Sequence, residues 1–251
     1  MFPLVSAILA SLFRIIFHNS ITTIFKTHHF RMHLNISKTH RFLAIFSTFC
    51  IALLLARILI KGSMFYVFLV WNLFLAIIPY AISSWLLHTR WIRKHTFPLC
   101  IFLGIWLLFL PNAPYLITDL MHLRYAKSSV IWFDALLLFA FALNGLLLGI
   151  FSLQHVFQVL MERWNVKTAK RILFCVVFLC GFGMYLGRFL RWNSWELFSD
   201  PMLLAQDCFR SILYPAYRMK TWGITLGFGS FLWVLLLGVQ TFIPIKKATT
   251  I

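Results

Sequence analysis

Six long apolar runs constrain the fold of this chain more than any other feature of its sequence. An α-helix needs about 20 mostly apolar residues to cross the hydrocarbon core of a bilayer. Five of the six runs approach or exceed that length. The runs predict an all-α fold, a polytopic transmembrane helix bundle of six spans, or of seven if residues 1–17 also cross. They lie at residues 42–60, 64–87, 97–110, 130–160, 172–190 and 222–243.

The composition also favours a membrane protein. Charged residues make up only 12% of the chain, whereas soluble domains carry about 25%. The net charge of +17 would suit a nucleic-acid-binding protein, but the basic residues lie between the apolar runs and no nucleic-acid motif occurs. We therefore expect no nucleic acid as a partner, and expect a lipid bilayer with anionic headgroups. The five cysteines form no C-x-x-C pair, so no disulfide framework or structural zinc site is predicted.

The third run ends in an unusual way. Its 14 residues, Phe97 to Leu110, cover only about 21 Å of a core roughly 30 Å thick, and Pro111-Asn112-Ala113-Pro114 follows at once. Either this span is too short, or the break lies at membrane depth. Non-helical backbone is tolerated at that depth only against protein or a watery cavity. The junction thus indicates where a functional site lies, without indicating its activity.

The distribution of lysine and arginine predicts the topology. Fourteen lie on the side that holds residues 18–41, and eight lie on the other side. The positive-inside rule places the fourteen in the cytoplasm, together with both ends of the six-span core. The predicted domains are a basic cytoplasmic segment at 1–41, a transmembrane domain at 42–245 and a short cytoplasmic tail at 246–251. Residues 1–17 are an interfacial helix, a seventh span, or a stretch upstream of a start at Met32.

Three spans carry two glycines four residues apart, a spacing that lets helix backbones approach closely. The pairs predict packing within one bundle, with a homo-dimer face as the alternative. They are Gly145/Gly149, Gly183/Gly187 and Gly223/Gly227. The fourth run would be about 46 Å long as a helix, so we expect it to tilt or to project beyond the bilayer at its polar residues 154–158.

Residues 201–213 predict a short amphipathic helix on the outer surface of the membrane, between the last two spans. Asp200 suits the N-cap of this helix, Pro201 suits its first position, and Pro215 ends it. Arg57 lies one turn before the end of the first span, and we expect its side chain to extend outward to the interface.

The six acidic residues are unevenly distributed, because five of them lie on the predicted outer side. Polar groups in hydrocarbon are costly and normally face the bundle interior or a cavity. We therefore expect one outward-facing polar site. Its candidate catalytic residues are Asp119, His122 and Glu196, and its candidate substrate-binding residues are Asn72, Asn112, Tyr115, Asp134, Arg188, Arg191 and Asn193.

Asp119 and His122 are three residues apart, which places both on one face of a helix. A carboxylate and an imidazole so placed could act as an oriented acid–base pair or hold a metal ion. The alternative is a helix-end cap beside an interfacial histidine. No His-Glu-x-x-His or comparable motif occurs, so neither a metal nor a cofactor is predicted.

Arg188 and Arg191 are also three residues apart. They could neutralise Asp119, Asp134 or Glu196 inside the bundle. They could instead bind an anionic headgroup or phosphate, for which the planar guanidinium group is well suited. The third interpretation is that both side chains extend to the outer interface.

Three segments carry a resemblance. They are Trp-Asn-Leu-Phe-Leu-Ala-x-Ile-Pro at 71–79, Leu-Pro-Asn-Ala-Pro-Tyr-Leu-Ile-Thr-Asp-Leu at 110–120 and Gly-Arg-Phe-Leu-Arg-Trp-Asn-Ser-Trp-Glu at 187–196. With them the chain resembles an uncharacterised family of bacterial multi-pass membrane proteins, catalogued as a domain of unknown function. The resemblance covers about residues 45–240 and implies a polytopic protein of the bacterial inner membrane. It implies no activity and no catalytic residue.

Three hypotheses for the function follow from these patterns. The first is a membrane-embedded enzyme or binding protein for an anionic envelope lipid or lipid-linked phosphate, in which Arg188 and Arg191 bind the anion. Asp119 and His122 would transfer protons, with Glu196 in support. The second is a transporter or channel for small solutes or ions, with the broken third span lining its path. The third is a non-catalytic subunit of an envelope complex. The chain has no Walker loop, dinucleotide fingerprint or nucleophile elbow, so nucleotide-driven transport by this chain alone is not expected.

Overall fold

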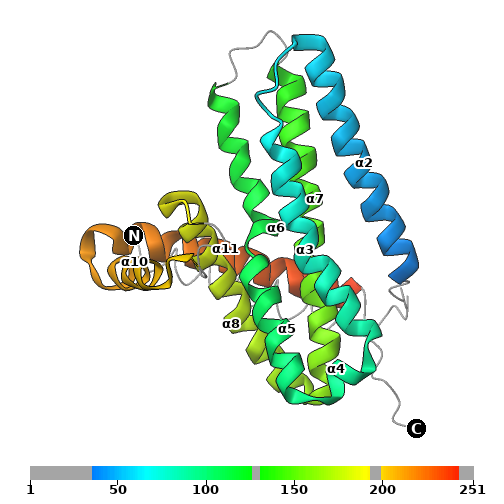
Figure 1. Ribbon diagram of the computed structural model, residues 1–251, viewed down its shortest axis with the longest axis vertical. Helices are drawn as coiled ribbons and strands as arrows, with labels where there is room; N and C mark the ends of the chain where they lie inside the picture. The colour runs from blue at the N-terminus through cyan, green and yellow to red at the C-terminus, as the bar shows by residue number, and fades with distance from the viewer. Residues whose placement is uncertain (1–35, 126–130, 193–198, 243–251) are drawn as a thin grey trace, which may run out of the picture. The chain divides into compact units, whose positions relative to one another are not determined.

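The computed structural model describes residues 36–125, 131–192 and 199–242 (Figure 1). These residues are almost entirely helical and contain no strand, which confirms the predicted all-α class. The helices are α2 Ile36–Lys61, α3 Phe68–His88, α4 Arg90–Lys94, α5 Thr96–Phe109, α6 Asn112–Tyr115, the 3₁₀-helix η1 Leu116–Tyr125, α7 Ile131–Arg163, α8 Val166–Tyr185, the π-helix η2 Leu186–Leu190, α10 Pro201–Leu213 and α11 Pro215–Phe242.

Six helical stretches in the described residues are long and apolar enough to cross a bilayer, as predicted. They are Lys38–Lys61, Phe68–His88, Thr96–Arg124, Ile131–Arg163, Val166–Leu190 and Met219–Phe242. The chain is therefore a multi-pass membrane protein. The predicted apolar segment at 1–17 and the tail at 246–251 lie outside the described residues.

The turn between the first two spans is set by a glycine. Gly62 has a φ of +61°, a conformation that favours glycine because it has no Cβ, and its N–H donates to the carbonyl of Ile58 at 2.7 Å. This contact ends α2, and residues 63–67 form the turn that follows. The second apolar run of the sequence begins at Met64, but the corresponding helix, α3, begins four residues later, at Phe68.

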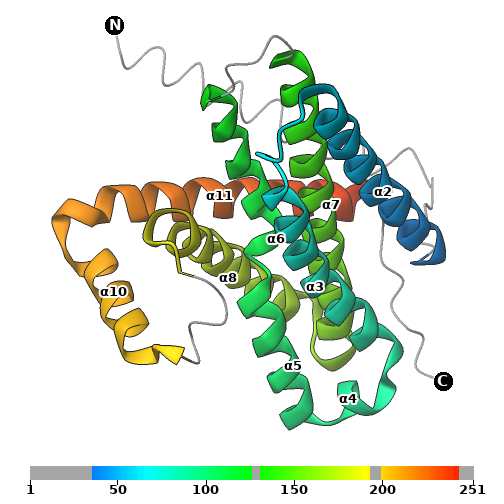
Figure 2. The same cartoon turned by 45° about the horizontal axis from the view of Figure 1, so that its top comes forward.

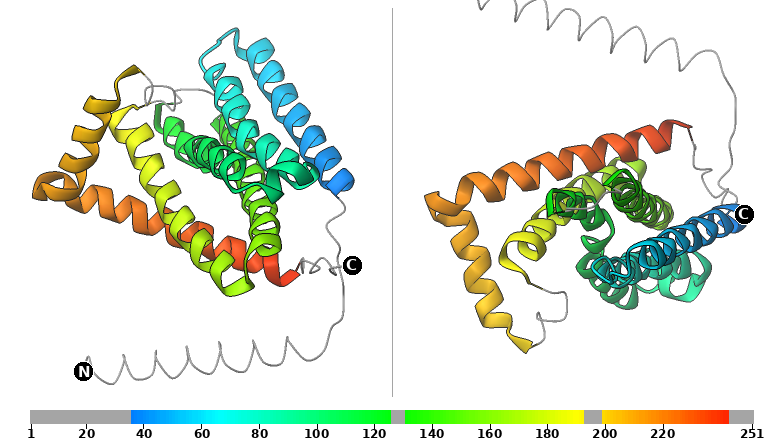
Figure 3. Two further views of the ribbon diagram at one scale, coloured as in Figure 1. Left: turned by 60° about the horizontal axis from the view of Figure 1, so that its bottom comes forward. Right: turned by 90° about the horizontal axis from the view of Figure 1, so that it is seen from above.

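Helix α7 is the central helix of the described bundle. Seen end-on, it lies between α2 and α3 on one side and α8 and α11 on the other (Figure 3, right). One apolar cluster joins it to α2 and α3 through residues such as Leu54, Leu69 and Phe141. A second joins it to α5, α8 and α11 through residues such as Trp106 and Val177. Side chains on α7 consequently have protein neighbours on most sides.

The break in the third span lies against protein in the middle of the bundle. Helices α5, α6 and η1 follow one another with backbone angles that stay in the right-handed helical region at Pro111 and Leu116. The break packs against Gly145 and Gly149, which lie near the middle of α7. The third candidate span runs through the break, from Thr96 to Arg124, and the depth of the break in the membrane stays a prediction.

The glycines of α7 and α8 explain how the break is accommodated. A Cβ atom at Gly145 would lie 2.5 Å from the carbonyl oxygen of Ala113, and one at Gly183 would lie 2.5 Å from Cγ of Pro111. The first two glycine pairs thus serve packing within one bundle, as predicted. Gly223 and Gly227 differ, because a Cβ at either would meet nothing within 4 Å.

Of the last two helices, α11 packs on α8 and α7, and α10 packs on α11. Helix α11 crosses α8 and α7 at a wide angle (Figure 2), and its main packing partner is α8. The predicted helix at 201–213 is present as α10, begins with Pro201 and ends before Pro215. The prediction for Asp200 is only half right, because it stands at the N-cap position but its side chain makes no capping hydrogen bond.

Candidate functional site

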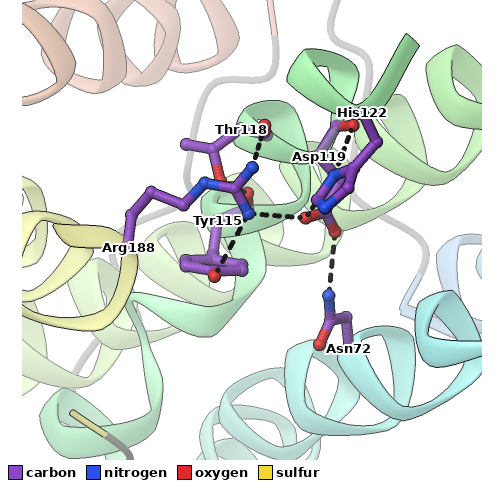
Figure 4. Close-up of polar contacts among 6 residues, drawn as sticks. All are labelled: Asn72, Tyr115, Thr118, Asp119, His122 and Arg188. Carbon is purple, nitrogen blue, oxygen red and sulfur yellow. Dashed lines mark hydrogen bonds and ion pairs between the residues drawn. The ribbon is translucent and has the colours of Figure 1, made fainter. Parts of the chain in front are cut away.

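A buried carboxylate, Asp119, is the centre of the candidate site (Figure 4). Its side chain is 1% exposed. Oδ2 accepts a hydrogen bond from Nδ2 of Asn72 at 2.8 Å, and Oδ1 accepts one from Nη1 of Arg188 at 3.3 Å. Nδ1 of His122 lies 3.8 Å from Oδ1. Three elements of the bundle, namely α3, η1 and η2, thus meet at one carboxylate.

Arg188 is held in place by more than its ion pair. Nη1 also donates to the hydroxyl of Tyr115 at 3.4 Å, and Nη2 donates to the backbone carbonyl of Thr118 at 3.1 Å. The guanidinium carbon lies 5.7 Å from the centre of the Tyr115 ring, within range of a cation–π interaction. The side chain nevertheless remains 18% exposed.

The contacts of His122 fix which of its ring nitrogens is free. Nδ1 lies 3.1 Å from the backbone carbonyl of Asp119, and a carbonyl oxygen only accepts hydrogen bonds. Nδ1 therefore carries the proton in the neutral ring, and Nε2 carries the lone pair. The ring packs against Phe68, with centroids 4.9 Å apart, and Phe65, at 6.5 Å, and the side chain is 24% exposed. A free imidazole nitrogen on a fixed, partly exposed ring can accept or donate a proton.

Both irregular helical segments of the described chain carry residues of this site. Asp119 and His122 lie on the ten-residue 3₁₀-helix η1, and Arg188 lies on the five-residue π-helix η2. Such stretches are unusual within helices and often occur at functional sites. The π-helix ends at Arg191, whose φ of +61° closes it while the N–H of Trp192 donates to the carbonyl of Leu186. The irregular backbone is thus what turns these side chains toward one another.

A second buried ion pair lies at the same end of the helices. Nε of Arg57 donates to Oδ1 of Asp134 at 2.9 Å, and both side chains are buried. The predicted extension of Arg57 to the interface is therefore wrong, because α2 turns this residue toward α7. The Arg57 guanidinium carbon lies 5.3 Å from the centre of the Tyr66 ring. Burial, and next the charge of Asp134, raise the pKa of Tyr66 above its ordinary value.

The remaining predicted site residues are distributed as follows. Asn72 and Tyr115 contact the Asp119 cluster, whereas Asp134 pairs with Arg57. Nδ2 of Asn112 donates to the carbonyl of Phe109, one turn away from the cluster. Arg191 is exposed. Asn193 and Glu196 lie outside the described residues.

The residues described here offer limited options for a metal ion. They contain no group of three or more His, Cys, Asp or Glu side chains placed to hold one. The arrangement around Asp119 instead combines one free imidazole nitrogen with the guanidinium group of a partly exposed side chain, Arg188. Chemically, it can bind an anion and exchange a proton next to it.

Sequence reasoning missed a second set of polar side chains. His155 is fully buried inside the bundle, and its Nδ1 lies 3.3 Å from Oγ of Ser83. Nδ1 of His40 lies 2.8 Å from the hydroxyl of Tyr80. The only available signal was the presence of Ser83, Tyr80 and His155 within apolar runs, where polar groups normally face the bundle interior.

Comparison with known proteins identifies a family but no activity. The model of a family described as a protein of unknown function (DUF1361) matches residues 71–235, a stretch that includes Asn72, Asp119 and Arg188. No curated protein and no solved structure matches the chain.

Proposed function

Since the chain belongs to this family of unknown function, we propose its function from the geometry around Asp119: a membrane-embedded enzyme or binding protein that takes an anionic lipid or lipid-linked phosphate. One observation carries the proposal. The side chains of Arg188 and His122 are both partly exposed, and both lie against the same buried carboxylate. A phosphate bound to Arg188 would therefore lie within reach of a proton carrier.

In this proposal Asp119 positions the site and does not itself exchange protons with a substrate. Its side chain is buried, and each of its oxygens already accepts a hydrogen bond, from Asn72 or from Arg188. A buried carboxylate with these contacts fixes the positions of the guanidinium group and the imidazole ring relative to each other. The sequence suggests proton transfer by both Asp119 and His122, whereas this proposal assigns it to Nε2 of His122 alone.

Arg188 has the capacity for a further ligand. The hydrogen bonds described for it occupy three of its five N–H groups, counted on the described residues. The remaining N–H groups are available to a phosphate oxygen. Charge-assisted hydrogen bonds of this kind contribute about 1.5–3 kcal/mol, or roughly 10- to 100-fold in affinity.

The transport alternative loses support from the position of the break in the third span. A solute path along that span would need a cavity beside Pro111 and Ala113. Instead, a Cβ atom added to Gly145, Gly149 or Gly183 would lie 2.5–3.2 Å from an atom of Pro111 or Ala113. Helices α7 and α8 therefore already pack closely against this segment. The subunit alternative receives no specific observation, so the anion-binding function is the one we put forward.

A binding measurement on the purified protein in phosphatidylcholine nanodiscs tests the proposal. The probes are dihexanoyl phosphatidic acid, dihexanoyl phosphatidylcholine and inorganic phosphate. We expect phosphatidic acid to bind at least about tenfold more tightly than phosphatidylcholine, and Arg188→Gln to remove that preference. Tight binding of inorganic phosphate alone would assign the site to a soluble anion, and equal affinity for the two lipids in the unmodified protein would overturn the proposal.

Two further variants separate binding from charge and from folding. Arg210→Gln removes the same charge from an exposed position on α10 and should leave the preference intact. Arg188→Lys retains the charge opposite Asp119 but loses the planar fork, so it should fold and bind with intermediate affinity. If Arg210→Gln weakens binding as much as Arg188→Gln does, the effect comes from general surface charge and the site is wrong.

A further inference from the structure

Helices α2, α3 and α7 share polar side chains at three depths of the bundle. On α7 these depths are marked by Asp134, Asn144 and His155, all of them buried. The 21 residues from Asp134 to His155 cover about 31 Å along the helix, which is close to the thickness of the hydrocarbon core. Burying polar groups between such apolar helices costs free energy, and polar groups in these positions usually have a functional role.

The partners at each level come from α2 and α3. Near one end Asp134 pairs with Arg57 of α2, and near the middle Nδ2 of Asn144 donates to Oγ of Ser47 at 2.9 Å. Near the other end Nδ1 of His155 lies 3.3 Å from Oγ of Ser83 on α3.

His155 is part of a wider cluster of titratable groups. The titratable groups of neighbouring helices near it, within the described residues, are His40 of α2 and Tyr80 and His88 of α3. The rings of Tyr80 and His155 have centroids 5.2 Å apart. Tyr80 and Ser84 contact the two nitrogens of His40, at 2.8 and 3.1 Å. Imidazole and hydroxyl groups therefore follow one another from α2 through α3 to α7.

Each of the three levels also contains a buried polar atom without a hydrogen-bond partner. Among the described residues these atoms are Nη1 of Arg57, Oδ1 of Asn144 and Nε2 of His155. Leaving such an atom unpaired costs about 1–3 kcal/mol. Native proteins normally pair it with an internal water molecule, which needs two or more polar partners. The positions of these atoms indicate water at all three levels of the same interface.

We propose that α2, α3 and α7 enclose a hydrated proton pathway between His155 and Asp134. A proton enters at the His40–His155 cluster, passes along water hydrogen-bonded to Asn144, and leaves at the Arg57–Asp134 pair. Asn144 and Arg57 orient water and do not themselves give up protons. Every carrier returns to its starting state, so the only net change is one proton moved across the bundle.

Two apolar layers make this pathway slow and gated. Leu137 and Phe141 lie between Asp134 and Asn144, and Leu148 lies between Asn144 and His155. Each layer occupies about 15 Å of helix, so a proton crosses it only along a file of several water molecules. Proton transfer therefore requires transient wetting of these layers, and its rate should depend on the polar groups on either side of them.

Proton flux into liposomes tests the proposal. The full chain is reconstituted with pyranine inside the vesicles, and a potassium gradient with valinomycin drives proton entry. We expect the protein to acidify the lumen faster than empty vesicles do, and His155→Phe and Asn144→Leu each to reduce that flux at least about tenfold. His95→Gln changes an exposed histidine at the start of α5 and should leave the flux unchanged.

Controls for folding keep the result interpretable. Each variant is reconstituted only as a monodisperse peak in size exclusion, and His155→Gln, which keeps hydrogen-bonding capacity but cannot carry a proton, replaces His155→Phe if the latter does not fold. Flux no faster than in empty vesicles would overturn the pathway. So would equal flux in the unmodified protein, the His155 variant and Asn144→Leu. The lipid-binding measurement above uses a different readout, so the two proposals can fail independently.

Discussion

Asp119 and Asp134 are both buried, and each carries an arginine as its ion-pair partner from another helix. The two pairs differ in what surrounds them. Arg57 is itself buried, whereas Arg188 is 18% exposed. A fully buried pair has no access to a ligand of lipid size, and its energetic role is to keep two helices together. A partly exposed pair can bind a ligand at the cost of part of its own contacts.

The Arg57–Asp134 pair should therefore dominate the attachment of α2. Arg57→Met leaves the charge of Asp134 buried without its partner, and we expect the free energy of unfolding to fall by about 3–5 kcal/mol. Denaturant titration in mixed micelles measures this change. The double variant Arg57→Met/Asp134→Leu removes both charges and should recover most of the loss.

A matched substitution on the same helix provides the control. Arg41 is exposed on α2, so Arg41→Met should change the free energy of unfolding by no more than about 0.5 kcal/mol. Equal effects of Arg41→Met and Arg57→Met would mean that the ion pair contributes nothing beyond general charge.

At the level of elements, the packing of the broken third span depends on the absence of side chains on its neighbours. The backbone oxygen of Ala113 lies where a Cβ of Gly145 would be, and a backbone atom cannot rotate away. Gly145→Ala should therefore lower the free energy of unfolding by about 1–3 kcal/mol, the usual cost of overpacking. Unfolding in mixed micelles measures the effect.

Gly223→Ala is the matched comparison, because the same added methyl group would meet nothing within 4 Å on α11. Alanine is the better helix former, so this variant should be unchanged or up to about 1 kcal/mol more stable. If both alanine variants behave alike, the glycine contacts at the break do not determine the packing of this element.

The sequence predicted these elements better than it predicted their contacts. The spans followed from apolar length alone, since a bilayer requires about 20 apolar residues. The partner of Arg57 could not be found in the same way, because Asp134 is 77 residues away and meets it only through the packing of α2 on α7. The burial of His155 could not be predicted for a related reason: a polar stretch at the end of a long apolar run looks the same whether it faces the bundle interior or the solvent.

The Asp119 site was predictable in part, for a local reason. Asp119 and His122 share a helical face whatever the tertiary fold, and the proline-rich break marks their position in the sequence. The roles of the neighbours were not predictable. The carbonyl of Thr118, on the 3₁₀-helix η1, accepts a hydrogen bond from Arg188, on the π-helix η2. No pattern in the sequence predicted either irregular helix.

At the scale of the whole molecule, the direction in which the bundle is inserted decides which leaflet the Asp119 site faces. Fourteen basic residues against eight favour a cytoplasmic location for the segments between α3 and α5 and between α7 and α8. That orientation places Asp119 and Arg188 toward the extracytoplasmic leaflet, because η1 and η2 end the third and fifth spans, which begin after these two segments. Five of the eight opposing charges lie within residues 188–220, from the end of the fifth span onward.

Reporter fusions decide the orientation. Alkaline phosphatase is active only outside the cytoplasm, so a fusion after Lys127 should be active and a fusion after Trp164 inactive, with the reverse pattern for green fluorescent protein. Truncated fusions can insert abnormally, and a sandwich insertion at the same positions in the full chain controls for this. The inverted pattern would place the Asp119 site at the cytoplasmic leaflet. The anionic lipid proposed for Arg188 would then have to be presented from inside the cell, and the proton pathway would run with its His155 end outward.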